Sequence, residues 1–309
     1  MSQASTAAAV QMSVEDAIGY ITLTEPERRN PLSITTMRSF LQALTDLSAN
    51  PAVRVIVVRA FGPAFSAGHD LTEVVGRSLD QEREIFTLCT KMMQKIHQVR
   101  QPVIASVQGI ALAAGCQLVA SCDLAVASTA ARFGTPGVKI GLFCSTPMVA
   151  LTRAIGRKQA MRMLLTGEMI DAATAMQWGL VNEVTNPETL DTVTRTMAQT
   201  VAKASAMTLS TGKEAFYRQI DLAEDDAYQA MQEVMAVNAV THDAQEGISA
   251  FLGKREPQWQ VSLPRPLALD PTGREEEHDG GRGGSRALQA ALPARGGIDR
   301  GNGEALSGG

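Results

Sequence analysis

Two short segments rich in small residues constrain this chain more than any other feature of its sequence. Residues 65–71 read Phe-Ser-Ala-Gly-His-Asp-Leu, and residues 108–118 read Gln-Gly-Ile-Ala-Leu-Ala-Ala-Gly-Cys-Gln-Leu. Each follows an apolar, β-branched run of the kind that forms a buried strand, Val55–Val58 or Val103–Val107. Since residues with almost no side chain let a ligand reach the main chain, two backbone N–H groups can face one point there. Such a pair stabilises a negatively charged carbonyl oxygen, so the sequence predicts a chemical site.

Composition excludes several classes of protein. The chain has 309 residues, 45% of them hydrophobic, which is enough for one large domain or two small ones. The net charge of −4 and the lack of a Lys/Arg-rich block argue against nucleic acid as a partner. No apolar run reaches the roughly 18 residues that cross a membrane, so no membrane partner is expected.

The cysteines and histidines indicate neither disulfides nor a metal site. The four histidines are scattered, and no CxxC spacing occurs among Cys89, Cys116, Cys122 and Cys144. The cysteines are therefore expected to be reduced core thiols, and no metal or redox cofactor is predicted. Residues 1–14 contain no Arg or Lys, which is not typical of a secretory signal or a transit peptide. Together these features predict a cytoplasmic location.

The hydrophobic pattern divides the chain into four parts. Residues 1–12 are expected to be a flexible N-terminus. In residues 13–187, β-branched runs alternate with helical patterns, which predicts parallel βαβ units and an α/β fold. Residues 188–260 show helical patterns only. Residues 264–309 are rich in Gly and Arg and cannot bury enough apolar surface to order, so a disordered tail is expected.

Within this frame the boundaries of several elements can be predicted. Ser33 is a candidate N-cap for one helix, Asp80 opens a second that Pro102 stops, and a third covers Ala113–Ser121. The last helix runs from about His242 to Leu252. Strands are expected at Ile18–Leu23, Arg54–Ala60, Val103–Val107 and Asp123–Ala127.

Several motifs, taken in order, resemble the enoyl-CoA hydratase/isomerase (crotonase) superfamily over residues 13–260. They are the two small-residue segments together with Glu-Pro-Glu-Arg-Arg-Asn-Pro-Leu-Ser at 25–33, Gly-Glu at 167–168, Trp-Gly-Leu-Val at 178–181 and Glu-Gly-Ile-Ser-Ala-Phe-Leu-Gly-Lys-Arg at 246–255. The resemblance implies a ClpP/crotonase-like spiral of ββα units followed by a helical trimerisation region at 188–260. It also implies a homotrimer or a dimer of trimers that acts on acyl-CoA thioesters in fatty acid or other lipid metabolism. Within the family, residues 133–147 are most similar to one animal subgroup.

The resemblance also implies the positions of the two N–H donors. They are the backbone N–H groups of His69 and Ala114, beside Ala67 and Leu71 of the substrate site. The second donor falls where a helix begins, and a helix N-terminus presents unpaired N–H groups and partial positive charge. The imidazole of His69 is expected to be a spectator, with a role as hydrogen-bond partner or base as the alternative.

Four further residues match the positions that bind coenzyme A in this family. Arg28 adjoins the nucleotide, with a surface salt bridge as the alternative. Asp70 contacts the pantetheine arm or, as the better expectation, caps the following turn. Phe251 and Lys254 reach the coenzyme A of a neighbouring subunit. Read alone, Phe251 would be a core residue and Lys254 a solvated charge at a helix end.

The two glutamates with which hydratases of this family activate water are missing. Their positions carry Gln117 and Gly137. A glutamine can orient water or substrate but cannot take a proton at neutral pH, and glycine has no side chain. The standard hydration mechanism is therefore not expected. Replacing both residues by glutamate is expected to gain hydration.

Three functions fit these residues. The first is a hydratase-like lyase with an atypical proton donor, and the second is decarboxylation of a malonyl-type acyl-CoA through the same enolate. The third is a non-catalytic acyl-CoA binding protein. Replacement groups for the glutamates are weak candidates: Cys144 as a nucleophile, or Ser145, Glu73 and His97.

Overall fold

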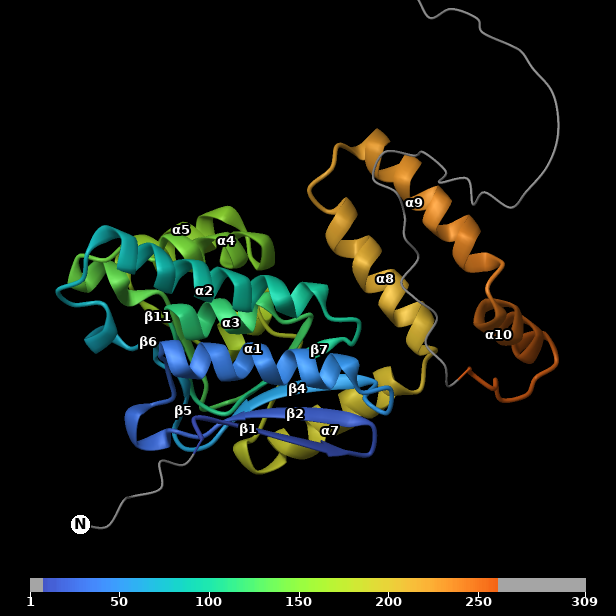
Figure 1. Cartoon of the computed structure of the whole chain (residues 1–309), viewed down its shortest axis with the longest axis horizontal. Coiled ribbons are helices and arrows are strands. Elements are labelled where there is room, and N and C mark those ends of the chain that lie inside the picture. The colour runs from blue at the N-terminus through green and yellow to red at the C-terminus, as the bar shows by residue number, and fades with distance from the viewer. Residues whose placement is uncertain (1–7, 261–309) are drawn as a thin grey trace, which may run out of the picture. The chain divides into compact units, whose positions relative to one another are not determined.

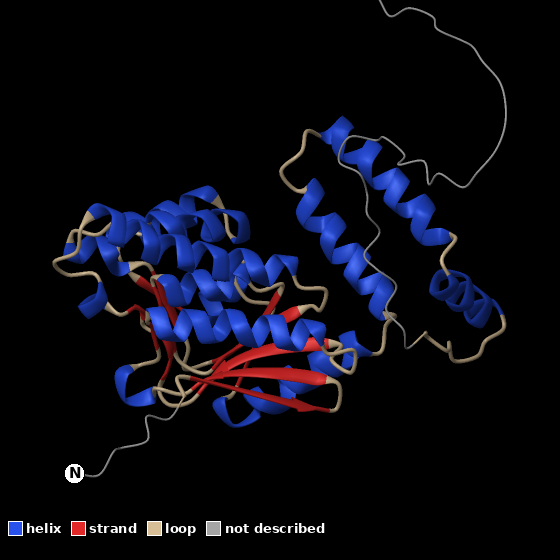
Figure 2. Ribbon diagram, in the orientation of Figure 1, coloured by secondary structure: helices blue, strands red, loops and turns tan. Residues whose placement is uncertain are grey.

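A six-stranded sheet lies at the centre of the structure, a computed structural model that describes residues 8–260 (Figures 1 and 2). Its strands pair in the order β1-β2-β4-β7-β9-β12, and every pair is parallel except the β1–β2 hairpin. The strands are β1 (Val10–Glu15), β2 (Ile18–Leu23), β4 (Val55–Ala60), β7 (Val103–Val107), β9 (Leu124–Ser128) and β12 (Glu183–Thr185). The expected α/β architecture is therefore confirmed.

Helices cover both faces of this sheet, which is why its strands are apolar throughout rather than alternating. In β4, Ile56 and Val58 pack into the large core cluster, which also contains residues of the helices α1 (Ile34–Ala49) and α2 (Leu79–Gln98). Val55 and Val57 point to the opposite face, into a smaller cluster. Figure 1 shows α1 and α2 on one side of the sheet and α7 (Leu190–Ala202) on the other.

Helix α7 differs from the expectation that only assembly helices follow residue 188. Its stripe of Leu190, Val193, Met197 and Val201 packs on β2, β4, β7 and β9 and forms the smaller cluster with the strands. The helix therefore belongs to the α/β part of the chain. The helical periodicity of the sequence predicts that one face is apolar. It does not predict that this face packs on the sheet.

Two smaller sheets are formed by the short strands of the ββα turns. The strands β4, β7 and β9 are each followed by a short strand and then, directly or after a short turn, by a helix. The short strands of the second sheet are β5 (Ala64–Ser66), β8 (Ile110–Leu112), β10 (Arg132–Gly134) and β11 (Met169–Asp171). A two-stranded parallel sheet joins β3 (Pro31–Leu32) to β6 (Gly68–His69).

The remaining helices complete the ββα turns and the C-terminal part. The α-helices are α3 (Ala114–Ser121), α4 (Ser145–Ala154), α5 (Arg157–Thr166), α6 (Ala172–Trp178), α8 (Ala206–Gln219), α9 (Glu224–Ala239) and α10 (His242–Leu252). The short 3₁₀ helices are η1 (Pro26–Arg28), η2 (Leu71–Glu73), η3 (Pro136–Ile140) and η4 (Pro187–Thr189). In the described part of the chain no helix is both long and apolar enough to span a bilayer.

Local capping sets the helix boundaries that could be predicted. Ser33 caps α1 by accepting from the Thr36 N–H, as expected. Helix α2 begins one residue before Asp80, because Ser78 and Gln81 form a reciprocal capping box. At the N-terminus, β1 starts at Val10, inside the segment 1–12 that was expected to be flexible, because it pairs with β2 from Val10 to Glu15. Residues 1–7 and the predicted tail 264–309 lie outside the described residues.

A buried ion pair holds α8 against the α/β part. The Lys213 Nζ lies 2.7 Å from Asp123 Oδ2 and donates to the carbonyls of Ile96 and Gln101. The Tyr217 hydroxyl donates to the other oxygen of Asp123 at 2.7 Å. Only 7% of the Lys213 side chain is exposed, so burial lowers its pKa against the opposing effect of Asp123. One buried cation thus connects residues of α2, α8 and the start of β9.

Candidate active site

The two small-residue segments meet where β6 approaches the first turn of α3. Gly68 has a φ of +95°, a conformation that favours glycine. A Cβ at Gly68 would lie 3.0 Å from the Leu112 carbonyl oxygen and 3.2 Å from the Ala114 nitrogen. The absence of a side chain therefore allows the segment before His69 to lie directly against the start of α3.

The two residues predicted to supply the donors line the same pocket. Ala114 is the first residue of α3, so its N–H has no partner within the helix. Ala113, which precedes it, has a φ of +49°, an uncommon conformation for a residue with a Cβ. Strand β6 pairs with β3 alone in a two-stranded sheet, so its other edge is available toward α3. His69 and Ala114 both line the pocket.

The pocket has a volume of about 570 Å³ and is formed by five parts of the chain. These are the β6–η2 segment, α2, the start of α3, η3 with its following loop, and the start of α4. Ala67 and Leu71 line it with His69 and Ala114, as the resemblance implied. Among the described residues, those that line it include no aspartate or glutamate. The site thus offers N–H donors and apolar walls, but no carboxylate base.

The imidazole of His69 is neutral at physiological pH. Burial lowers its pKa to about 4. The ring packs edge-on against Phe86 at 5.3 Å between centroids, and its Nε2 is buried without a hydrogen-bond partner in the described chain. A neutral imidazole in this packing supports the expectation that the main chain of His69 carries the chemistry.

Acid is expected to destabilise the protein through His69. The folded-state pKa of about 4 lies below the ordinary value of 6.5, so the unfolded chain binds the proton more tightly between these values. The stability due to neutral His69 is complete above pH 6.5 and is lost as the pH falls toward 4, by about 2 kcal/mol at pH 5. Urea unfolding at pH 7.5 and 5 should show this loss in the wild type and not in His69→Ala. Parallel pH profiles for the two proteins would contradict it.

Arg28 and Asp70 lie together beside the donor strand. The Arg28 guanidinium pairs with Asp70 Oδ2 at 2.5 Å, and the other Asp70 oxygen accepts from the Thr72 N–H and caps η2. Burial raises the pKa of Asp70, but these hydrogen bonds hold it below its usual value. The predicted cap and the predicted salt bridge are thus both present. Neither residue lines the pocket.

Gly137 lines the pocket, whereas Gln117 does not. Gln117 is 5% exposed, its Oε1 has no hydrogen-bond partner in the described chain, and it is not among the lining residues. Gly137 does line the pocket, at the start of η3. A Cβ at Gly137 would overlap the Leu142 carbonyl oxygen and lie 2.8 Å from Cys144 Sγ. The loop that follows η3 thus occupies the space that a side chain at residue 137 would need.

This packing predicts that a side chain at residue 137 lowers the stability of the protein, whereas the gain of hydration expected from restoring both glutamates stays a prediction. Gly137→Ala should lower the free energy of unfolding by about 1–3 kcal/mol because the new methyl overpacks the loop, and Gly137→Glu should cost more. Gly212→Ala is the control, since no atom lies within 4 Å of its Cβ position and, like Gly137, it does not have the left-handed φ that strains an alanine. Denaturant unfolding measures the difference. Equal effects at the two glycines would show that the loop opens freely.

The weak candidates for replacement acids or nucleophiles have other roles. Burial raises the pKa of the Cys144 thiol, so this lining cysteine is protonated at neutral pH and is not an activated nucleophile. Ser145 also lines the pocket, but no hydrogen bond joins it to a base among the described residues. Glu73 accepts from the Ile34 N–H and caps α1. His97 stacks on Tyr217 at 3.9 Å, and burial lowers its pKa.

The structure does not bring Phe251 and Lys254 to this pocket. Phe251 lies on α10 and is 82% exposed, so it is not a core residue of the single chain. Lys254 follows α10 with a φ of +50°. Sequence reasoning missed Phe86 and Lys139, which line the pocket from α2 and η3. In the sequence, Phe86 lies next to the predicted apolar face of a helix and Lys139 lies close to Gly137. Neither position alone indicates that the residue lines a pocket.

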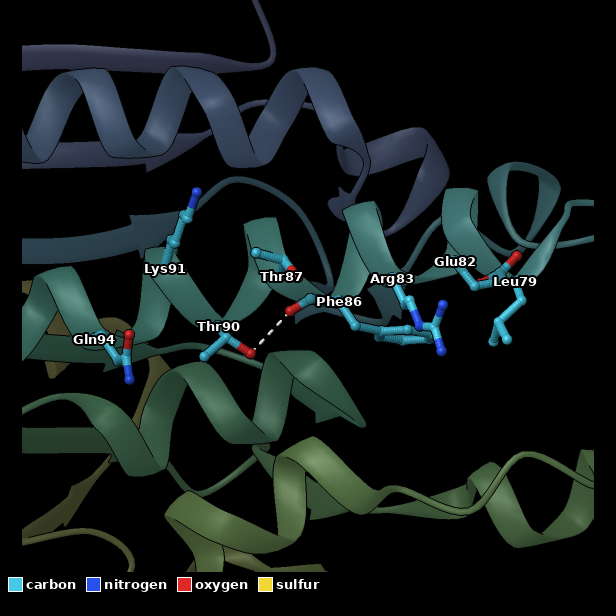
Figure 3. A pocket seen from close by; sticks show the side chains of 8 residues that line it. All are labelled: Leu79, Glu82, Arg83, Phe86, Thr87, Thr90, Lys91 and Gln94. Carbon is cyan, nitrogen blue, oxygen red and sulfur yellow. Dashed lines mark hydrogen bonds between the residues drawn. The ribbon is translucent and has the colours of Figure 1, made fainter.

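A second hollow of about 530 Å³ lies along the outer face of α2 (Figure 3). All eight side chains that line it come from this helix. Thr90 Oγ1 donates to the Phe86 carbonyl within it. Phe86 separates this surface from the pocket that holds the two donors, since it lines both.

Comparisons with known proteins agree with this geometry. The model of the enoyl-CoA hydratase/isomerase family matches residues 13–262. The chain is 45% identical over 249 residues to enoyl-CoA hydratase domain-containing protein 3, mitochondrial, of Xenopus laevis, covering 80% of this chain and 85% of the relative. This is the animal subgroup that residues 133–147 indicated.

Two solved structures have the same fold. Human enoyl coenzyme A hydratase domain-containing protein 3 aligns with a TM-score of 0.79 at 43% identity, covering 81% of this chain and 100% of that one. A Mycobacterium smegmatis enoyl-CoA hydratase aligns with the same TM-score and identity, covering 81% and 98%. The predicted crotonase fold is thus confirmed by experimentally solved relatives.

The prediction of a cytoplasmic location is wrong, because the Xenopus laevis relative is named as mitochondrial. The four cysteines are free and buried, which agrees with a reducing compartment. Redox state alone does not distinguish one reducing compartment from another, and this is why the inference failed. On the family match and these relatives, the chain belongs to the enoyl-CoA hydratase/isomerase (crotonase) family.

Proposed function

We propose that the pocket binds the acyl group of a coenzyme A thioester and stabilises its enolate. The N–H groups of His69 and Ala114 would hold the thioester oxygen, and each such donor typically lowers the barrier by about 2.7–4 kcal/mol. The observation that carries the proposal is the contact between Gly68 and the first residue of α3, at the wall of one apolar pocket. No further cofactor is needed for this step, since the thioester is itself the substrate.

Lyase chemistry of the hydratase type would require an atypical proton donor. Hydration adds a water oxygen to C3 and a proton to C2. It therefore needs a group that activates the water and a group that supplies the proton. No carboxylate lines the described pocket, His69 is neutral, and burial keeps the Cys144 thiol protonated. Gln117 is the one residue at a hydratase position that can still orient water or substrate.

Decarboxylation of a malonyl-type acyl-CoA is the second candidate, favoured by the same lack of a carboxylate. When the bond between C2 and the carboxyl carbon breaks, its electron pair forms the enolate and CO₂ leaves. C2 then takes one proton from water to give the saturated acyl-CoA. The reaction therefore needs the oxyanion donors but no base, which matches what lines the pocket.

A substrate panel separates these functions. The purified full chain is incubated with crotonyl-CoA, a longer enoyl-CoA and methylmalonyl-CoA, and the products are weighed by mass spectrometry. Loss of CO₂ supports decarboxylation, and water addition above a Gln117→Ala control supports hydration. Saturable binding without turnover supports a non-catalytic acyl-CoA binding protein. Failure of all three thioesters to bind would overturn the proposal.

We also propose assembly as a homotrimer or a dimer of trimers through α8–α10. These helices expose large apolar side chains that the single chain leaves uncovered, and an exposed surface of this kind is typical of an interface. They are Phe216, Ile220, Tyr228, Met235, Val240, Ile248, Phe251 and Leu252. Native mass spectrometry should give three or six copies of the 32.9 kDa chain, and a monomer at micromolar concentration would contradict this.

We propose a mitochondrial location and a role in fatty acid or other lipid metabolism. The first rests on the name of the Xenopus laevis relative and the second on the proposed thioester substrate. Fractionation of cells that express the full-length protein tests the location. Recovery in the cytosolic fraction alone would contradict it.

A further inference from the structure

One cationic side chain lines the otherwise uncharged pocket. Lys139, on η3, is the one lysine or arginine among its described lining residues, and no aspartate or glutamate accompanies it. We propose that Lys139 binds a carboxylate on the acyl group, so that the preferred ligands are carboxyacyl-CoA thioesters. This inference rests on the proposed function, because it names the substrate class of the same site.

The stem of Lys139 packs beside Gly167, the glycine that ends α5. Gly167 ends α5, and its missing side chain leaves a notch that the lysine crosses. The Cε and Cγ atoms of Lys139 lie 3.0 and 3.2 Å from the position that a Cβ of Gly167 would occupy. Packing of the aliphatic stem leaves the ammonium group as the part available to a ligand.

The charge of Lys139 is not matched by the protein. In the described chain no carboxylate lies within ion-pair distance of its ammonium group. The neighbouring lining residues Ile140, Leu142 and Phe143 are apolar. Lys139 and these three residues are exposed, so its ammonium group is open to a ligand, and a carboxylate on the acyl group can accept a charge-assisted hydrogen bond from it. A neutral acyl chain gains nothing from the same group.

A phosphate of coenzyme A is the other anion that Lys139 could meet. The position of the lysine favours the acyl group, since it lines the same pocket as His69 and Ala114, whose N–H groups are proposed to hold the thioester oxygen. Arg28, the residue implied for the nucleotide, lies outside the pocket lining. The two cations therefore serve different parts of the thioester.

Binding measurements on the full chain distinguish these sources. Isothermal titration with coenzyme A, butyryl-CoA, malonyl-CoA and succinyl-CoA compares the wild type with Lys139→Gln and Lys139→Glu. Lys158→Gln is the matched control, since Lys158 is exposed and does not line the pocket. Lys139→Gln should weaken at least one carboxyacyl-CoA about tenfold, and Lys139→Glu more, while butyryl-CoA changes less than about twofold.

Two results would overturn the inference. Equal weakening of coenzyme A, butyryl-CoA and the carboxyacyl-CoA ligands would assign Lys139 to a phosphate. Unchanged binding of every ligand would show that the ammonium group contacts none of them. In both cases wild-type binding of any of these thioesters leaves the proposed function intact, whereas failure of all of them to bind would overturn the proposed function itself. The titrations thus distinguish a wrong assignment of the carboxyacyl preference from a wrong assignment of the thioester site.

Discussion

Lys213→Met is expected to lower the free energy of unfolding by about 3–5 kcal/mol, the typical cost of removing one partner of a buried ion pair. The substitution keeps the unbranched stem but leaves the Asp123 carboxylate, 15% exposed, without its cation. It also leaves the carbonyls of Ile96 and Gln101 without the donor that joins them to α8. Urea unfolding at a fixed protein concentration measures the change.

Two further variants make this prediction specific. Lys203→Met removes an exposed lysine that follows α7 and should change stability by less than about 0.5 kcal/mol. Adding Asp123→Asn to Lys213→Met should recover part of the loss, because no uncompensated charge then remains. A Lys213→Met protein within about 1 kcal/mol of the wild type would show that water or a rearranged side chain replaces the ammonium group.

Gly68→Ala is expected to lower turnover by about 100-fold, since loss of one oxyanion donor typically costs 10²–10³ in kcat. The new methyl would press on the Leu112 carbonyl and the Ala114 nitrogen at 3.0 and 3.2 Å, and would move the two donors apart. The measurement is kcat for whichever thioester the substrate panel shows to react. Binding of the unreactive butyryl-CoA should weaken far less, because the donors act on the enolate.

The control for this prediction is Gly76→Ala. Gly76 also has a positive φ, +76°, but no atom lies within 4 Å of its Cβ position. An alanine at residue 76 therefore has the same kind of backbone strain as an alanine at residue 68, but it makes no contact with α3. Equal losses of kcat in the two variants would trace the effect to strain, and the assignment of the oxyanion site would fail.

The part of the candidate site that depends on small residues after strands could be located from the sequence. Small residues after strands, at 65–71 and 108–118, are visible without a structure, and four of the expected residues line one pocket. The space around Gly137 was not predictable, since the overlapping Leu142 carbonyl depends on how η3 and the following loop close. The assembly role of Phe251 and Lys254 stays a prediction, because one chain does not hold the partner's pocket.

The sequence by itself determined the periodic elements, the caps and the small-residue segments, because these depend on neighbouring residues and their backbone preferences. Ser33 and the small residues around Gly68 are examples. The tertiary structure alone decided that α7 covers the sheet, that Lys213 meets Asp123, and that Lys139 lies beside Gly167 and lines the pocket. A local pattern shows which face of an element is apolar or charged. Only packing between residues far apart in the chain determines what that face meets.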